Sequence, residues 1–216
     1  MMAPFRTALS VGLLASCLAA CSDISDVPNS DFAKVGVLIY RQILGGEESV
    51  PRERVAAIPY ATLGVRLGSS DQVMFVLGSV SGGDLHWIGG KQFAITTHGG
   101  RIVRTVGFLH NLTGFQKSSP TAGATHDYLY DFAELNAYSI LVRCSERDVG
   151  PERIVIVGYP HDTVHVAEDC RAAQLDWTFT NDFWKDAATG YVWKSQQYIQ
   201  PDIDALTLES LRPAQE

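Results

Sequence analysis

The chain of 216 residues has no excess of basic residues, and this limits the partners that it can bind. It contains 17 Lys and Arg against 24 Asp and Glu, a formal net charge of −7 at pH 7. Domains that bind nucleic acid usually carry a basic stripe, so the composition argues against nucleic acid as a partner. The sequence also offers no polybasic patch for anionic lipid headgroups, so attachment to a membrane needs another feature.

The sequence also lacks the short motifs of common catalytic and cofactor sites. It has no Gly-x-Ser-x-Gly elbow, no phosphate-binding loop and no dinucleotide fingerprint. Of the six histidines, only His161 and His165 have a suggestive spacing. Their neighbours predict a strand, on which residues four apart stand about 13 Å from each other, too far to share one metal ion. We therefore predict no metal, no cofactor and no catalytic residue.

Pairs of acidic residues leave enzymatic alternatives open. Hydrolysis of sugars uses two carboxylates about 5 to 9 Å apart, and Glu47-Glu48 or Glu168-Asp169 could supply them. With 24 acidic residues, adjacent pairs also arise by chance. A polysaccharide-modifying hydrolase thus remains an alternative to a non-enzymatic protein. A carrier of lipid or another apolar ligand is a third hypothesis.

The apolar run near the N-terminus is too short to cross a bilayer. It spans about a dozen residues, whereas a membrane-spanning helix needs about 20. Arg6 precedes it and small residues follow it, which is typical of a secretory signal peptide. The tetrapeptide Leu-Ala-Ala-Cys at 18–21 resembles the lipobox of bacterial lipoproteins. We predict that residues 1–20 are removed and that Cys21 is acylated; an ordinary signal peptide that happens to contain cysteines is the alternative.

Residues 21–30 are expected to tether a domain close to the membrane. Three acyl chains on Cys21 give stable anchoring, which a single chain does not. Lipoproteins of this kind are usually retained at the inner membrane when Asp follows the cysteine, but here Ser22 follows it and Asp23 comes one place later. We therefore predict the outer membrane, with the domain on its periplasmic side. The polar tether after the cysteine reaches about 30 Å at most.

Two cysteines, Cys144 and Cys170, remain in the predicted mature chain. The compartment implied by the lipobox is oxidising, and disulfides form there readily. A disulfide between them is the expectation, and two separate buried thiols are the alternative. Because Cys144 shares one face of a predicted strand with Ile140 and Val142, we expect it to point toward the core.

From residue 60 onward the pattern is that of strands joined by tight, glycine-rich turns. Residues 111–126 form the longest predicted irregular segment. Helical signals occur at residues 31–44, 51–57 and 202–211. The strands are predicted at 60–67, 72–80, 84–88, 92–97, 101–108, 137–146, 152–159, 163–168, 173–180 and 191–198.

These elements predict one mainly β domain over residues 31–216. About ten strands, with short helices at the N- and C-terminal ends, fit an antiparallel sandwich or a partly closed β-barrel. The loops of two to four residues between the first five predicted strands favour antiparallel neighbours.

Several stretches of the mature chain follow one another in a recognisable order and spacing behind the lipobox. They are 58–61, Trp87, 99–107, 183–186, 189–196 and 208–213. Together they resemble the YjbF/GfcB family of outer-membrane lipoproteins associated with exopolysaccharide and group 4 capsule production. The resemblance implies a role in making, secreting or regulating surface polysaccharide. It also implies partners among periplasmic or outer-membrane proteins of an export pathway, or the polysaccharide itself. It carries over no catalytic residue.

Aromatic residues near the C-terminus are the best candidates for a contact surface. Core packing is the favoured interpretation for most of them, because aromatic side chains bury large areas. Trp184 lies among charged neighbours, so we expect it to be exposed and to contact glycan or a partner protein. Arg101 and Arg104, three apart on a predicted strand, should lie on opposite faces unless a bulge intervenes, so we do not expect them to form one clamp for an anionic sugar. For Arg104 we expect an internal ion pair.

Overall fold

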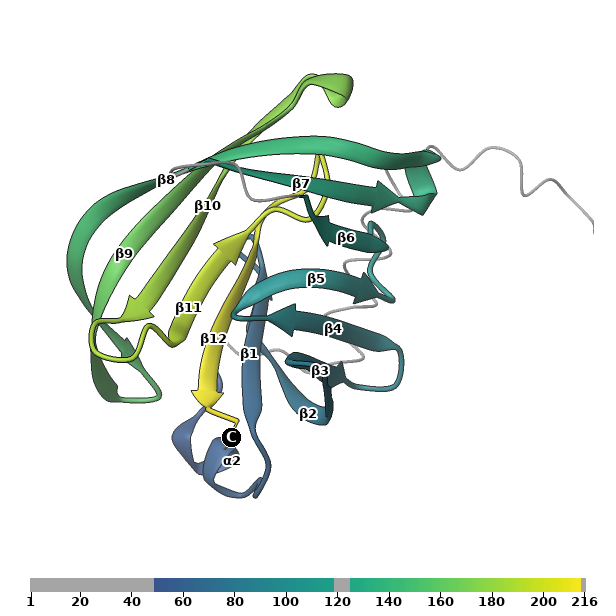
Figure 1. Ribbon diagram of the computed structural model, residues 1–216. Coiled ribbons are helices and arrows are strands. Elements are labelled where there is room, and N and C mark those ends of the chain that lie inside the picture. Colours follow the sequence, from purple (N-terminus) through teal and green to yellow (C-terminus); the bar gives the residue numbers. More distant parts are fainter. Residues whose placement is uncertain (1–48, 119–124, 215–216) are drawn as a thin grey trace, which may run out of the picture.

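The computed structural model describes residues 49–118 and 125–214. Their twelve strands form one antiparallel sheet in the order β5-β4-β3-β2-β1-β12-β11-β10-β9-β8-β7-β6 (Figure 1). The first half contains β1 Thr62–Leu67, β2 Val73–Ser81, β3 Asp84–Gly89, β4 Phe93–His98 and β5 Arg101–Val106. The second half contains β6 Gly114–Lys117, β7 Thr125–Phe132, β8 Ala137–Ile156, β9 Tyr159–Ala172, β10 Trp177–Asp186, β11 Val192–Gln197 and β12 Leu206–Arg212.

The strand order makes the sheet an up-and-down ring. Almost every strand lies beside its neighbour in sequence, and β12 pairs with β1 to join the two ends of the chain. The ring stays open between β5 and β6, where a backbone hydrogen bond of 2.8 Å from Thr105 N to Leu112 O links the β5 edge to the segment before β6. The mainly β, antiparallel, partly closed barrel predicted from the sequence is therefore confirmed.

One helix and two single turns complete the described structure. Helix α2, Arg52–Ala56, confirms the helix predicted at 51–57, with Pro51 before its first turn. Two 3-10 turns, Ala133–Leu135 and Ala173–Leu175, connect β7 to β8 and β9 to β10. No helix of the described segments is long and apolar enough to cross a membrane. The predicted signal peptide, Cys21, the tether and the helix at 31–44 lie outside the described residues.

The two strands predicted at 137–146 and 152–159 are a single strand, β8. The register shifts between Asp148 and Gly150, so the segment predicted as a turn is a bulge within an extended chain. Pro151 is tolerated there because β7 pairs only with the first part of β8, as far as Ser145. This part of β8 pairs with β9 alone in the described structure, and prolines in sheets are confined to such edge strands and to bulges.

The helix predicted at 202–211 is wrong, since β12 occupies most of that range. Leu206, Leu208 and Ser210 are buried at every second position, which is the period of a strand. The strand fits between β1 and β11 and pairs with both. The segment predicted to be irregular, 111–126, also contains β6 and the first residues of β7.

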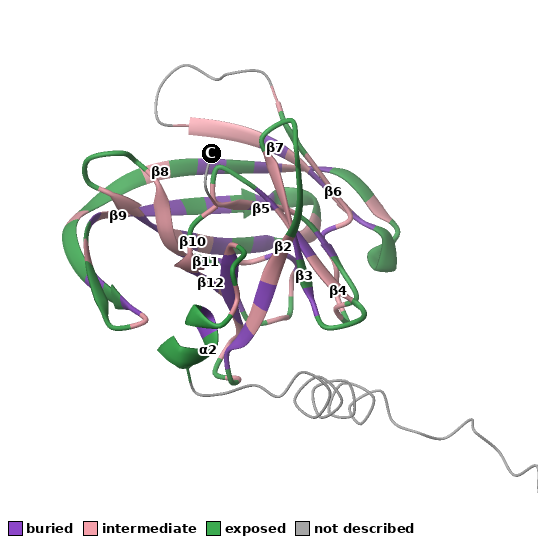
Figure 2. Ribbon diagram, turned by 90° about the horizontal axis from the view of Figure 1, so that it is seen from below, coloured by how far each residue is buried: buried purple, intermediate pink, exposed green. Residues whose placement is uncertain are grey.

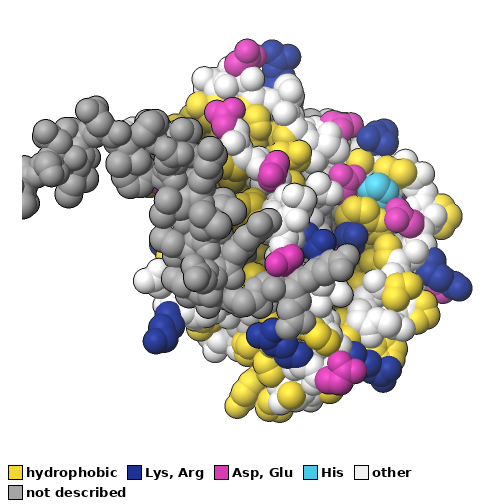
Figure 3. Space-filling model, turned by 180° about the vertical axis from the view of Figure 1, so that it is seen from behind, with side chains coloured by type: hydrophobic (Ala, Val, Ile, Leu, Met, Phe, Trp, Pro, Cys, Tyr) yellow, Lys and Arg dark blue, Asp and Glu magenta, His cyan; other side chains and the backbone are white. Residues whose placement is uncertain are grey.

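The core fills the inside of the ring, and buried positions alternate with exposed ones along the strands (Figure 2). Its largest fully buried apolar side chains are Phe75, Phe132, Ile95 and Leu112. On the outer face drawn in Figure 3, acidic and basic side chains are interspersed where the residues are coloured. That view shows no broad patch of one charge sign among its coloured residues.

The predicted disulfide between Cys144 and Cys170 is present. The two residues face each other across β8 and β9, and both side chains are buried in the core. The pair closes a loop with a sequence separation of 26. Cross-linking such a loop lowers the entropy of the unfolded chain and so stabilises the folded protein.

Replacing Cys144 and Cys170 together with alanine should lower the free energy of unfolding by about 3 kcal/mol. Urea denaturation under non-reducing conditions measures the change. Ser145→Ala, at an exposed neighbouring position, is the control and should stay close to the wild type. Equal stability of the double variant and the wild type would contradict a structural role for the bond.

Candidate functional site

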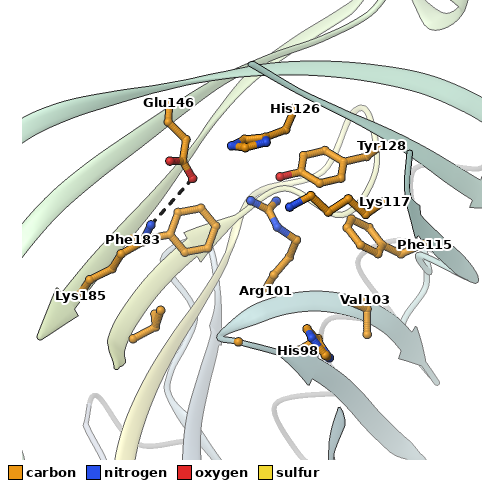
Figure 4. A pocket seen from close by; sticks show the side chains of 12 residues that line it. His98, Arg101, Val103, Phe115, Lys117, His126, Tyr128, Glu146, Phe183 and Lys185 are labelled. Carbon is orange, nitrogen blue, oxygen red and sulfur yellow. Dashed lines mark ion pairs between the residues drawn. The ribbon is translucent and has the colours of Figure 1, made fainter. Parts of the chain in front are cut away.

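A cleft of about 340 Å³ opens into the inside of the ring between β5, β6 and β7 on one side and β8 and β10 on the other (Figure 4). Arg101 comes from the start of β5, directly after the tight turn at Gly99-Gly100. Gly100 has a φ of +82°, and a Cβ there would lie 2.5 Å from Val192 Cβ. Glycine therefore lets β5 begin against β11, on the opposite side of the ring.

Gln197 of β11 fixes this close approach. Its Oε1 accepts a hydrogen bond of 2.9 Å from Ile102 N, and its Nε2 donates one of 2.9 Å to Gly100 O. Gln197 itself is buried. The beginning of β5 is thus held across the interior by a side chain, in addition to its ladder with β4.

The floor of the cleft is an ion pair between Arg101 and Glu168 of β9. Arg101 Nη2 lies 2.7 Å from Glu168 Oε1, and the side chains are 14% and 0% exposed. Burial is the largest influence on the guanidinium and opposes its charge, but Glu168 together with Tyr130 and Tyr128 outweighs burial and raises the pKa of Arg101. A buried charge is tolerated only when it is paired and hydrogen-bonded in this way.

Two neighbours complete the hydrogen bonding of Glu168. Tyr128 donates its hydroxyl to Oε1 at 3.1 Å, and Asn181 donates Nδ2 to Oε2 at 3.2 Å. Asn181 is itself positioned because its Oδ1 accepts from Tyr198 N at 2.9 Å. Both oxygens of the carboxylate are therefore satisfied, and Glu168 serves as the centre of a buried polar network.

Aromatic rings flank the guanidinium. Arg101 Cζ lies 4.6 Å from the ring centroid of Tyr128 and 5.1 Å from that of Phe183. Phe115 of β6 packs beside Tyr128, with 5.1 Å between ring centroids. Burial raises the pKa of the Tyr128 hydroxyl and raises that of Tyr130, which lies behind it on the same face of β7, to about 12. Both tyrosines stay protonated at neutral pH.

The mouth of the cleft carries two lysines. Lys185 Nζ of β10 lies 3.8 Å from Glu146 of β8, and both side chains are partly exposed. Lys117 of β6 extends toward the guanidinium of Arg101 (Figure 4). It is exposed, and no carboxylate of the described segments pairs with it. His126 of β7 lies beside the same opening.

The expectation that Trp184 is exposed is wrong. Its side chain is 9% exposed and lies on the outer face of β10, directly opposite His165 of β9. The two rings stack with 4.6 Å between their centroids, and Lys194 Nζ lies 4.9 Å from the indole ring. Side chains of the two neighbouring strands, β9 and β11, thus cover the ring instead of leaving it in water. Its role as a contact for glycan or a partner stays a prediction.

The two histidines with suggestive spacing have separate surroundings. His161 stacks on Trp193 at 3.9 Å, whereas His165 Nε2 lies 2.7 Å from Asp182 Oδ1. Both histidines are on β9, so they lie on a strand and not on one face of a helix. In the part of the chain that the structure describes, one group of possible metal ligands converges, formed by Cys144, Cys170 and Glu168. Its two sulfurs are bonded to each other, so they are not available to a metal.

The structure also shows where the adjacent acidic residues and the two arginines of the sequence analysis lie. Glu168 points into the ring, whereas Asp169 is exposed on the outer face, near Arg147. The other acidic pair, Glu47-Glu48, lies outside the described residues. The expectation that Arg101 and Arg104 lie on opposite faces is wrong, because the register of β5 against β4 shifts between them and their partners, His98 and Thr96, are two apart on β4. Arg101 is the one that is buried and ion-paired, while Arg104 is exposed.

Sequence reasoning missed the network around Glu168, although one signal for it was present. Glu168 lies two residues before Cys170, so both share one face of any strand that contains them. Once the disulfide is placed in the core, Glu168 must be buried too, and a buried carboxylate needs a cation. Which arginine supplies that cation depends on the fold, because Arg101 is 67 positions away.

A family model and one relative of similar sequence point to the same family, and a solved structure shows the same fold. The family model described as "Group 4 capsule polysaccharide lipoprotein gfcB, YjbF" matches residues 37–211. An Escherichia coli (strain K12) protein described as "Uncharacterized lipoprotein GfcB" is 26% identical over 178 residues, which cover 77% of this chain and 82% of that relative. The crystal structure of the hypothetical lipoprotein YmcC from E. coli (K12) has the same fold. It is 22% identical, with a TM-score of 0.68, and the match covers 89% of this chain and 100% of that one.

Removing the charge at the centre of the network should destabilise the fold. Glu168→Gln leaves the buried guanidinium of Arg101 without its counter-ion, so the free energy of unfolding should fall by about 3 kcal/mol or more. Glu146→Gln, which removes a partly exposed carboxylate from the same cleft, should cost less than about 1 kcal/mol. Chemical denaturation of both variants gives the comparison. Similar small losses in the two would mean that the buried pair is not important for stability.

Stability should also decline at alkaline pH because folding raises the pKa of Tyr130 from 10.0 to about 12. The buried, protonated hydroxyl contributes fully to the stability of the fold below pH 10. This contribution is lost as the pH rises from 10 toward 12, because the unfolded chain then releases the proton more readily than the folded protein does. Tyr130→Phe should lose less stability over this range, as measured by thermal unfolding at each pH. Parallel pH profiles of the variant and the wild type would refute this linkage.

Proposed function

Because this chain belongs to the YjbF family of group 4 capsule polysaccharide lipoproteins, we propose that it is a non-enzymatic accessory factor in the production or export of a surface polysaccharide. The family match over residues 37–211 is the observation that carries the proposal. Every strand from β1 to β11, and nearly all of β12, lies within the matched range. The comparison therefore concerns the whole barrel rather than a shared fragment.

The proposed site of action is the periplasmic face of the outer membrane. The lipobox-like tetrapeptide that ends at Cys21 supports a lipid anchor, and Ser22 after it supports sorting to the outer membrane. Acyl chains would then hold the barrel near the membrane, close to where a polysaccharide leaves the cell. A protein anchored there can bind the polysaccharide or a neighbouring protein of the same pathway.

The chemistry of the cleft favours binding over hydrolysis. A general acid or nucleophile has to reach the bond that it cleaves. Glu168 is fully buried and uses both oxygens on Arg101, Tyr128 and Asn181. Glu146 at the mouth is paired with Lys185. The cleft therefore offers cations and aromatic rings to a ligand, rather than two free carboxylates.

Loss of the gene in the organism of origin should reduce the amount of polysaccharide on the cell surface. The wild-type gene should restore it, and so should Cys17→Ala, which changes the other cysteine of the signal segment. Cys21→Ala should not restore it, because the protein would lack its lipid anchor. Extraction and quantification of surface polysaccharide from the four strains provide the measurement.

Two results would contradict the proposed function. One is an unchanged amount of surface polysaccharide after loss of the gene. The other is a shortening of the purified polysaccharide when it is incubated with the protein, because that would reveal a hydrolase.

A further inference from the structure

We propose that the cleft between Arg101 and Lys117 is a binding site for a carboxylate-bearing sugar residue of an acidic polysaccharide. This inference rests on the proposed function and names the ligand class for it. It depends on how charge, unsatisfied hydrogen-bonding groups and aromatic rings are combined in one opening.

Two cations point into the same space. Lys117 reaches from β6 toward the guanidinium of Arg101 on β5 (Figure 4). Like charges that face each other repel, and the repulsion is relieved when an anion lies between them. Within the described residues, Glu168 and Glu146 are engaged with Arg101 and Lys185, so Lys117 remains without a counter-ion. An anion from outside would supply one.

One buried donor in the cleft is unsatisfied. Arg101 Nη2 donates to Glu168, but Nη1 is buried and has no hydrogen-bond partner among the described residues. A buried donor without an acceptor costs free energy that a ligand oxygen can recover. A carboxylate has two oxygens, so one can accept from Nη1 while the other contacts the ammonium group of Lys117.

The walls of the cleft suit a sugar ring. Phe115 and Phe183 lie on opposite sides of the opening, on β6 and β10 (Figure 4). Aromatic faces pack against the apolar face of a sugar, and the polar groups of the sugar remain free for hydrogen bonds. The volume of about 340 Å³ is at the lower end of the roughly 300 to 1,000 Å³ of small-ligand sites. It suits one or two sugar residues of a longer chain.

The charge of the cleft also argues against the hypothesis that the protein carries a lipid or another apolar ligand there. An apolar ligand would take the ammonium group of Lys117 out of water without giving it an acceptor, which is costly, and would leave Arg101 Nη1 unsatisfied. The chain as a whole has a formal net charge of −7. On a protein of net negative charge, a cationic opening favours contact of an anionic chain at that place.

Calorimetric titration of the purified full-length protein with oligogalacturonate and with oligoglucuronate tests this assignment. Each probe is paired with its methyl ester, which keeps the sugar and removes the charge. We expect at least one acid to bind about tenfold more tightly than its ester, because a charge-assisted hydrogen bond is lost. Lys117→Gln should weaken binding of the acid by about tenfold. Added salt should also weaken it.

Arg104→Gln is the matched control, since it removes an exposed cation of the same strand that does not line the cleft and should leave binding unchanged. Lys117 is exposed, so its variant should fold normally, which thermal unfolding checks. The assignment is overturned if neither acid binds, if acid and ester bind equally, or if Lys117→Gln binds like the wild type. It is also overturned if inorganic phosphate at the same concentration displaces the acid completely, because the site would then recognise any anion.

The two proposals can fail separately. If the polysaccharide of the host binds equally to the wild type and to Lys117→Gln, the accessory function stands and this cleft is not the site. If the acidic probes bind as expected but loss of the gene leaves surface polysaccharide unchanged, the cleft is a sugar site and the accessory function fails.

Discussion

The ion pair between Arg101 and Glu168 is the interaction on which the interior of this barrel depends. The ring of strands is open between β5 and β6, so β5 lacks a full ladder on one side. Side chains make up for part of that gap across the interior. Arg101 joins β5 to β9, and Gln197 joins the start of β5 to β11. A sheet edge that would otherwise be free is thereby held against the opposite wall.

The same interaction creates the chemistry of the cleft. Because Glu168 accepts from Nη2, the orientation of the guanidinium is fixed, and Nη1 is buried without a hydrogen-bond partner among the described residues. Tyr128 and Phe183 hold it further, from two sides. The site is therefore preorganised, and a ligand that fits it has little ordering entropy to lose. Structural stability and the proposed recognition of an anion come from one buried arginine.

The local sequence pattern was sufficient to predict most strands. It was not sufficient for elements whose structure depends on the strands beside them. Residues 202–211 have apolar positions at spacings of both two and three, and pairing with β1 and β11 selects the strand. The environment of Trp184 depends on His165, which is near it only across the ladder. The core position of Cys144 followed from alternation alone. Glu168 could have been placed by the same rule, but its partner Arg101 is brought to it by the closure of the ring.

A crystal structure of the protein with a bound acidic oligosaccharide would test most directly whether this arginine organises a recognition site. We predict that the sugar carboxylate lies within hydrogen-bond distance of Arg101 Nη1 and Lys117 Nζ, with its ring between Phe115 and Phe183. A sugar bound on the outer face, for example over Trp184, with this cleft unchanged, would contradict that prediction.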